Sequence, residues 1–291
     1  MIRPNTQTYL TWFIASLFLF AGCDKIENPV VKSNEYDENI YGAVPTFIPE
    51  LNPLQRVLLE DFTGHECGNC PKAHIAAKNI LASDTDRVAV VAIHAGSLAQ
   101  PFPPTYPEDF TTTEGTYYLL TQVGSDQMPK GRINRFPNAN NVTNYPDWSD
   151  QVDSALQSTP LANMQLKTDF QPASSKLNIH VFTNWLESFS GQARLIVLVT
   201  ENGIIAPQLT YIPTPPITDT AYHHEHVLRR SATGATGLVA FNNPQSGASK
   251  TDSYTIDWNP NWVPENCEVI AFLTNGLDGD VINVAKTKVI P

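Results

Sequence analysis

The chain has 291 residues, of which 42% are hydrophobic and 16% charged, and its formal net charge is −11. This length suits one large domain or two of ordinary size, and this composition supplies a packed core and excludes global disorder. The acidic balance argues against nucleic-acid binding and against electrostatic attachment to anionic lipid.

The first residues have the pattern of a targeting segment. Arg3 supplies a positive charge, and the apolar run Tyr9–Phe20 is too short to span a bilayer comfortably. The residues Leu19-Phe20-Ala21-Gly22-Cys23 then resemble a bacterial lipobox. We therefore predict that residues 1–22 are a lipoprotein signal peptide and that Cys23 becomes the lipid-modified N-terminus. A soluble secreted protein, cleaved near the same point, is the alternative.

Residues 23–52 are polar, acidic and interrupted by proline, with no sustained hydrophobic period. We predict a flexible, lipid-anchored tether here, with a reach of roughly 25–30 Å. We therefore predict that the protein lies in the cell envelope, where covalent lipid and not charge attaches it to the outer membrane.

The most informative stretch lies between a predicted strand and a predicted helix. The apolar run Val57–Phe62 indicates a buried strand, and Pro71–Leu81 indicates a helix with an apolar stripe. Cys67 and Cys70 fall at the start of this helix, where residues three apart face the same way within disulfide reach. The positive end of the helix favours a thiolate at Cys67. The pattern predicts a redox site.

Strand and helix patterns continue to alternate up to residue 159. Arg87–His94 predicts a second buried strand, of the kind found in sheets that are covered on both faces. We expect helices at Thr113–Val123 and Trp148–Gln157, and a short strand at Arg132–Asn134. This alternation predicts an α/β domain over residues 53–159.

From residue 160 the pattern changes to strand-like runs separated by Gly, Pro, Asn and Ser. The expected strands are Asn163–Phe170, Lys176–Asn184, Ala193–Glu201, Val227–Ser231, Asp252–Trp258, Cys267–Asn275 and Asp280–Val289. Roughly seven strands over about 130 residues predict an all-β domain, an immunoglobulin-like β-sandwich, over residues 160–291. Alternation in the sixth of these strands points Cys267 the same way as Val269, which predicts a buried and inert thiol.

The α/β domain has two further informative features in addition to the cysteines. Asp61 lies six residues before Cys67, and Met128-Pro129 stands before the short strand. In both respects the domain resembles thioredoxin, whose members carry a buried acid and a cis-proline at these places. The resemblance implies a thioredoxin-like fold, a cis Pro129 near Cys67, and catalytic roles for Cys67, Cys70, Asp61 and Pro129. Glu66 departs from the family, which has an aromatic residue before the first cysteine, and this leaves the direction of electron flow open.

Three segments carry a narrower resemblance. They are Val57–Gly64 leading into Cys67–Pro71, Arg132–Arg135 and His226–Arg229. With them, about residues 55–291 resemble the Omp28-related outer-membrane lipoproteins of Bacteroidetes-type bacteria. The resemblance implies a lipid-anchored thioredoxin-like domain followed by a β-sandwich.

The mechanism that follows from these features is thiol-disulfide exchange. Cys67, as an exposed nucleophile, attacks a disulfide of an exported protein, and Cys70 resolves the mixed disulfide. Asp61, if it is buried, takes the Cys70 proton, because burial raises the pKa of a carboxyl group towards the working range. Two alternatives stay open for the cysteine pair: a structural disulfide and a zinc half-site.

Histidines supply the only candidates for further metal ligands. His224 and His226 share a face if their segment is a strand, but a polar strand edge or a hydrogen-bond cluster between domains is the alternative. His65 would stabilise a Cys67 thiolate when protonated, or would lie exposed in a loop. No phosphate-binding glycine loop or catalytic-triad order occurs, and we expect no cofactor.

Two hypotheses for function remain. The first is a thiol-disulfide oxidoreductase anchored in the envelope, which acts on exported proteins. The second is a non-enzymatic surface lipoprotein, in which the sandwich binds a partner and the Cys67–Cys70 disulfide is structural. The fold alone does not separate them, because thioredoxin-like domains serve both roles.

Overall fold

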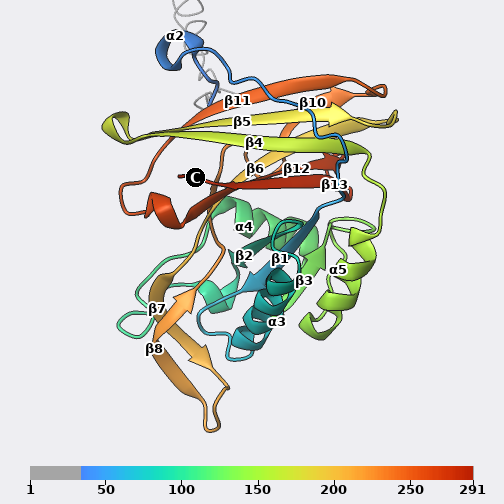
Figure 1. The fold of residues 1–291 in the computed structure, drawn as a ribbon. Coiled ribbons are helices and arrows are strands. Elements are labelled where there is room, and N and C mark those ends of the chain that lie inside the picture. The colour runs from blue at the N-terminus through green and yellow to red at the C-terminus, as the bar shows by residue number, and fades with distance from the viewer. Residues whose placement is uncertain (1–33, 291) are drawn as a thin grey trace, which may run out of the picture. The chain divides into compact units, whose positions relative to one another are not determined.

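The computed structural model describes residues 34–290, so the predicted signal peptide and Cys23 lie outside the described residues (Figure 1). Strands dominate the fold, in several sheets, and helices are fewer. Among the described helices, none combines the length and the hydropathy that crossing a bilayer requires.

The largest sheet joins strands from both halves of the chain. Its order is β13-β12-β6-β9-β2-β1-β3, and β10 pairs with β6 beside this path. The bounds are β1 Val57–Thr63, β2 Val88–His94, β3 Lys130–Ile133, β6 Gln192–Glu201, β9 Val227–Ser231, β10 Leu238–Asn242, β12 Cys267–Asn275 and β13 Val281–Lys288. Strands β1 and β2 are parallel, and β3 is antiparallel to β1.

The junction between the halves lies at β2 and β9. These strands are parallel and pair at Ala92 and Val227, and the Ala92 N–H donates to the His226 carbonyl at 2.8 Å. Residues 34–290 therefore belong to one compact unit. The predicted boundary at residues 159 and 160 marks a change of architecture within this unit, and its use as a domain boundary stays a prediction.

Helices cover both faces of β1 and β2. On one face, α3 (Cys70–Ser83) and α5 (Trp148–Leu156) pack against Val57 and Leu59. On the other, α4 (Thr113–Tyr117) leads into a π-helical segment, Tyr118–Val123, which packs against Leu58 and Phe62. Alternate β1 side chains thus enter two different cores, which explains why the sequence of this strand is apolar without interruption.

A second sheet lies across the β6-β12-β13 end of the first (Figure 1). It has the order β11-β5-β4, with β4 at Ala162–Gln171, β5 at Lys176–Trp185 and β11 at Ser249–Asp257. The core between the sheets includes Leu177 and Val181 from β5 and Val197 and Val269 from the facing strands. This pair of sheets is sandwich-like.

The predicted strands and helices are all present, with ends that differ by a few residues. The sequence did not indicate β10, nor the hairpin formed by β7 (Ile204–Thr210) and β8 (Ile217–His224), which pair with each other in a separate sheet. Pro207 interrupts β7 at a shift in the register, and this obscured the strand pattern.

The predicted flexible coil is wrong for much of the tether that the structure describes. The ring of Phe47 stacks on that of Phe182 at 5.4 Å, and Lys167 Nζ lies 4.9 Å from the Phe47 ring centre. Lys167 also donates to the Thr46 carbonyl at 2.7 Å. Nearby, α2 (Glu38–Tyr41) follows a bridge between Glu35 and Tyr254. These contacts hold the segment against the β11-β5-β4 sheet.

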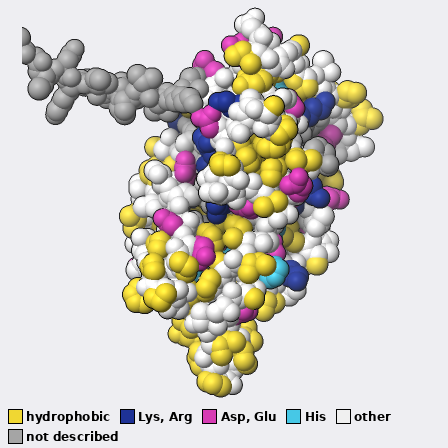
Figure 2. Space-filling view, turned by 90° about the vertical axis from the view of Figure 1, so that its left-hand side faces the viewer, with side chains coloured by type: hydrophobic (Ala, Val, Ile, Leu, Met, Phe, Trp, Pro, Cys, Tyr) yellow, Lys and Arg dark blue, Asp and Glu magenta, His cyan; other side chains and the backbone are white. Residues whose placement is uncertain are grey.

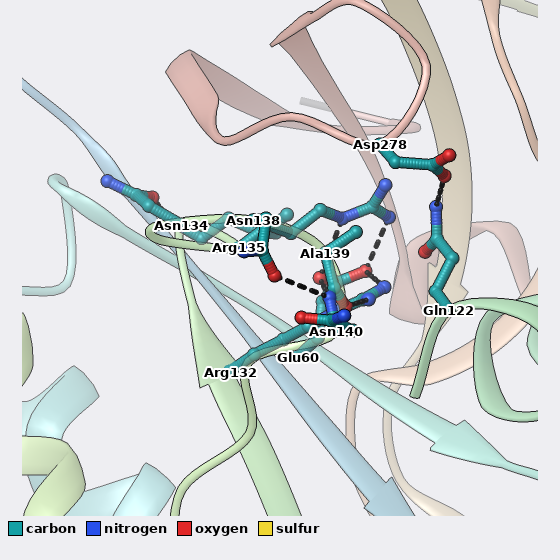
Figure 3. A network of polar contacts seen from close by, with 10 residues as sticks. Glu60, Gln122, Arg132, Asn134, Arg135, Asn138, Ala139, Asn140 and Asp278 are labelled. Atoms are coloured by element: carbon teal, nitrogen blue, oxygen red, sulfur yellow. Dashed lines mark hydrogen bonds and ion pairs between the residues drawn. The ribbon is translucent and has the colours of Figure 1, made fainter. Parts of the chain in front are cut away.

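A buried ion cluster lies on the α4 side of β1 (Figure 3). Arg132 donates to both carboxylate oxygens of Glu60, at 2.6 and 3.0 Å, and Arg135 does the same at 2.9 and 2.7 Å. All three side chains are fully buried. Burial alone would raise the pKa of Glu60, but the two guanidinium groups lower it to about 2. The cluster therefore holds one carboxylate and two cations in the interior.

Candidate functional site

Cys67 and Cys70 form a disulfide, as their spacing predicts, with Cα atoms 5.3 Å apart. Cys70 begins α3, and its N–H donates to the Cys67 carbonyl at 3.0 Å. The turn from β1 into α3 thus brings both sulfurs to the positive end of a helix, where a thiolate is stabilised.

The predicted exposure of Cys67 is wrong. Cys67 is 2% exposed and Cys70 is 0% exposed. The cover is the β7–β8 hairpin, which runs beside α3 in Figure 1. The disulfide is therefore closed to solvent by a segment far along the chain.

Hydrogen bonds fix the hairpin to the residues that precede α3. The Leu209 N–H donates to the His65 carbonyl, and the Tyr211 N–H to the Gly68 carbonyl, both at 2.8 Å. The fully buried side chain of Gln208 donates through Nε2 to the carbonyl of Cys67 at 3.1 Å. These bonds place the hairpin backbone directly over the disulfide turn.

Close packing accompanies these bonds at Gly68. A Cβ atom on Gly68 would lie 2.3 to 2.6 Å from atoms of the Tyr211 ring. Any larger residue at position 68 would therefore displace the ring or the hairpin.

Asp61 is buried at 1% exposure, as the resemblance to thioredoxin implies. It shares a β1 face with Val57 and Leu59, the face that packs on α3. Its Oδ1 has no hydrogen-bond partner among the described residues, and Oδ2 lies 3.6 Å from Nε2 of His74. Burial raises the pKa of Asp61 to about 8, so the carboxyl group is mostly protonated at pH 7.

His74 connects Asp61 to the hairpin. It lies one helical turn after Cys70, on the same face of α3. Its Nε2 is 3.0 Å from Thr63 Oγ1, and its Nδ1 is 2.6 Å from the Tyr222 hydroxyl of β8. Burial, with the charges of neighbouring histidines, lowers the pKa of His74 to about 3. The pair of Asp61 and His74 is therefore neutral at pH 7.

Pro129 follows a cis peptide bond, as predicted. It lines an open cavity of about 800 Å³ together with Asn69, Leu98 and Tyr145. Pro129 and Asn69, the residue directly before Cys70, thus line the same cavity. A smaller cavity, of about 460 Å³, reaches Asp61 from the α3 and β8 side.

His224 and His226, the candidate metal ligands, do not share a strand face. β8 ends at His224, His226 has a left-handed φ of 56°, and β9 begins at Val227. His224 packs in a ring cluster with Phe110 and His94, at 5.1 and 5.5 Å between ring centres. Across residues 34–290, no group of three or more His, Cys, Asp or Glu side chains is arranged to hold a metal ion.

The remaining sequence candidates are buried. His65 is 1% exposed; its Nε2 lies 2.8 Å from the Gln100 carbonyl, and its ring stacks on Tyr106. Cys267 is a free thiol and is buried, as predicted, and burial raises its pKa to about 12. Its inertness stays a prediction.

Sequence reasoning missed the residues that cover and adjoin the disulfide. They are His74, Gln208, Tyr211 and Tyr222. His74 carried a usable signal, because it lies four residues after Cys70 on a predicted helix. The hairpin residues carried none, because nothing in their local pattern relates them to the cysteines.

Comparison with known proteins gives a family match. Residues 117–291 match the family described as Outer membrane protein Omp28. The matched region starts at the end of α4, so it includes the hairpin and the sandwich-like sheets but not the two cysteines. Comparison with curated protein sequences gives no match.

Two solved structures from Porphyromonas gingivalis are similar to this chain. HBP35 has a TM-score of 0.61 at 17% identity, over 81% of this chain and 76% of HBP35. A domain of the outer membrane lipoprotein Omp28 has a TM-score of 0.31 at 19% identity, over 45% of this chain and 90% of that domain. At this identity, the likeness to HBP35 is evidence of a shared fold and of nothing finer.

Proposed function

Because this chain belongs to the Omp28 family of outer membrane proteins, we propose that it is an envelope lipoprotein that exchanges disulfides with exported proteins. In this proposal residues 53–159 form a thioredoxin-like domain with Cys67 and Cys70 as its redox pair. Cys23, outside the described residues, carries the lipid that anchors the protein at the outer membrane.

Several features support a thioredoxin-like site. A parallel β1–α3–β2 unit carries the disulfide at the start of its helix, and the antiparallel β3 follows a cis-proline. The likeness of the fold to HBP35 is in keeping with this arrangement.

The observation that carries the proposal is the buried carboxyl group of Asp61. It has an oxygen without a partner in the described part of the chain, and its pKa is raised to about 8. Such a group costs stability, and a purely structural disulfide gains nothing from it. Perturbed carboxyl groups of this kind concentrate where protons are transferred.

The exchange can be written from the oxidised pair. A partner thiolate attacks Cys67 Sγ, the bond between the cysteines breaks, and its electron pair stays on Cys70, which takes the proton of neutral Asp61. The second partner thiol, once deprotonated, attacks the partner sulfur of the mixed disulfide and releases Cys67 as a thiolate at the helix terminus. The partner loses two electrons and gains a disulfide, and the pair is reduced. The reverse reaction uses the same groups.

A non-enzymatic lipoprotein with a structural disulfide is the second candidate. The 2% exposure of Cys67 and the hydrogen bond from Gln208 favour it. In this case the disulfide would only fix the turn beneath the hairpin, and another surface would bind the partner.

Trapping of intermediates separates the two candidates. A Cys70→Ser variant, expressed in its native envelope, should accumulate reducible mixed disulfides through Cys67, seen on non-reducing gels and identified by mass spectrometry. The Cys67→Ser variant should trap far less, and Cys267→Ser should behave like wild type because its thiol is buried away from the site. If Cys70→Ser traps no partner, the structural candidate takes over.

A further inference from the structure

We propose that residues 64–68 form a docking edge for an extended polypeptide, and that the β7–β8 hairpin occupies this edge as an internal stand-in for the partner. The inference rests on the proposed function, since it names the form in which an exported protein would reach Cys67. The partner would displace the hairpin and bind in its place.

The edge consists of carbonyl acceptors. Leu209 and Tyr211, two residues apart on the hairpin, donate their N–H groups to the carbonyls of His65 and Gly68. Alternate residues of an extended peptide also donate when it adds to the edge of a sheet, whereas the acceptors here belong to a turn and lie three residues apart. Gln208 supplies a side-chain amide to the carbonyls of Gly64 and Cys67, at 3.3 and 3.1 Å. An occupant of this edge must therefore present backbone N–H groups in an extended row.

The side chain that the hairpin places against Gly68 of this edge is aromatic. The Tyr211 ring lies on Gly68, where the missing Cβ leaves room for a flat group. Tyr211 as a whole is nevertheless 45% exposed, so it covers the cysteine turn from outside and is not part of a core. The preferred occupant is thus an extended segment with an aromatic residue over Gly68.

The hairpin has only a small anchorage. Its two strands form a sheet of their own, and its buried apolar contacts are limited to a cluster of Phe110, Ala206 and Val227 with Ile204 beside it. Hydrophobic side chains gather at the lower end of Figure 2, at the height of the hairpin tip in Figure 1. Among the tip residues, Ile217 is 45% exposed. Such an element can open without unfolding the sheets.

Displacement of the hairpin would also change the surroundings of Asp61. Tyr222 of β8 holds Nδ1 of His74 at 2.6 Å, and His74 adjoins Asp61. Displacement of the hairpin therefore uncovers the disulfide and frees the histidine beside the proton donor in a single movement.

The test is the rate at which dithiothreitol reduces the Cys67–Cys70 disulfide in the full mature chain, followed by alkylation with N-ethylmaleimide and mass spectrometry. Tyr211→Ala and Gln208→Ala should each raise this rate about tenfold, because each weakens the closed state. Tyr211→Phe keeps the ring and should stay near wild type. Ile205→Ala, which is 60% exposed on the same hairpin and lies six residues before Tyr211, is the matched control and should also stay near wild type. Wild-type rates in both Tyr211→Ala and Gln208→Ala would overturn the proposal.

The docking part needs a second arm. A peptide with the sequence of residues 206–212 should bind the Tyr211→Ala protein saturably and restore slow reduction of the disulfide, and the same peptide with alanine at the tyrosine position should not. Acceleration without peptide protection would reduce the hairpin to a simple cover and overturn the docking edge. Both arms use small probes, so they can succeed even if Cys70→Ser traps no partner in the envelope, in which case only the proposed function fails.

Discussion

Two adjacent acidic residues of β1 have opposite electrostatic environments, although both are buried. Glu60 faces two guanidinium groups, which lower its pKa to about 2. Asp61 points to the α3 face, where no cation meets it among the described residues, and burial raises its pKa to about 8. One strand therefore holds a permanent anion on one face and a protonatable acid on the other, because successive side chains alternate between faces.

The Asp61→Asn variant tests the buried acid through stability. A carboxyl group whose pKa is raised on folding stabilises the native state fully below its unfolded pKa of about 4, and this contribution is lost as pH rises through about 8. The wild type should therefore lose stability relative to Asp61→Asn between pH 4 and pH 8, by roughly 1–4 kcal/mol. Urea unfolding of both proteins across this range measures the difference. If the unfolding free energies of the two proteins changed with pH in parallel, Asp61 would be ionised in the native state and its charge balanced by a neighbouring group.

The Glu60→Gln variant tests the ion cluster. Removing the carboxylate leaves Arg132 and Arg135 buried without their counter-charge, and such a loss costs about 3–5 kcal/mol. Glu187→Gln, at an exposed position, is the control and should change the unfolding free energy by less than about 0.5 kcal/mol. An effect of Glu60→Gln no larger than that of the control would show that the cations find other partners.

At the scale of elements, periodicity predicted most of the fold. Sustained apolar patterns located α3, β1, β2 and the sandwich strands, because each buries a face in a core. The hairpin had no such pattern, because Pro207 interrupts β7 and Ala206 alone among the apolar residues of that strand is buried. Cys67 was expected to be exposed for the same reason, since its cover includes Gln208, 141 residues away in the chain. Local pattern carries no information on a contact of that range.

At the scale of the whole molecule, one sheet links the disulfide to the part of the chain that matches the family. β9 and β2 pair across the junction, and the hairpin that covers Cys67 emerges between β6 and β9 of the matched region. The two predicted domains are therefore joined through a sheet and through the cover of the site. If the hairpin opens as proposed above, the second half of the chain would control access to the disulfide.

The reduction potential of the Cys67–Cys70 disulfide tests the central claim most directly. It is measured in the purified mature protein by equilibration with defined glutathione buffers and quantification of the thiols. A helix terminus that stabilises the Cys67 thiolate favours the reduced pair, so the account predicts a potential within the range of exchange proteins, about −120 to −270 mV. A potential below about −300 mV would contradict the account, because a disulfide that stable belongs to the structure and not to exchange.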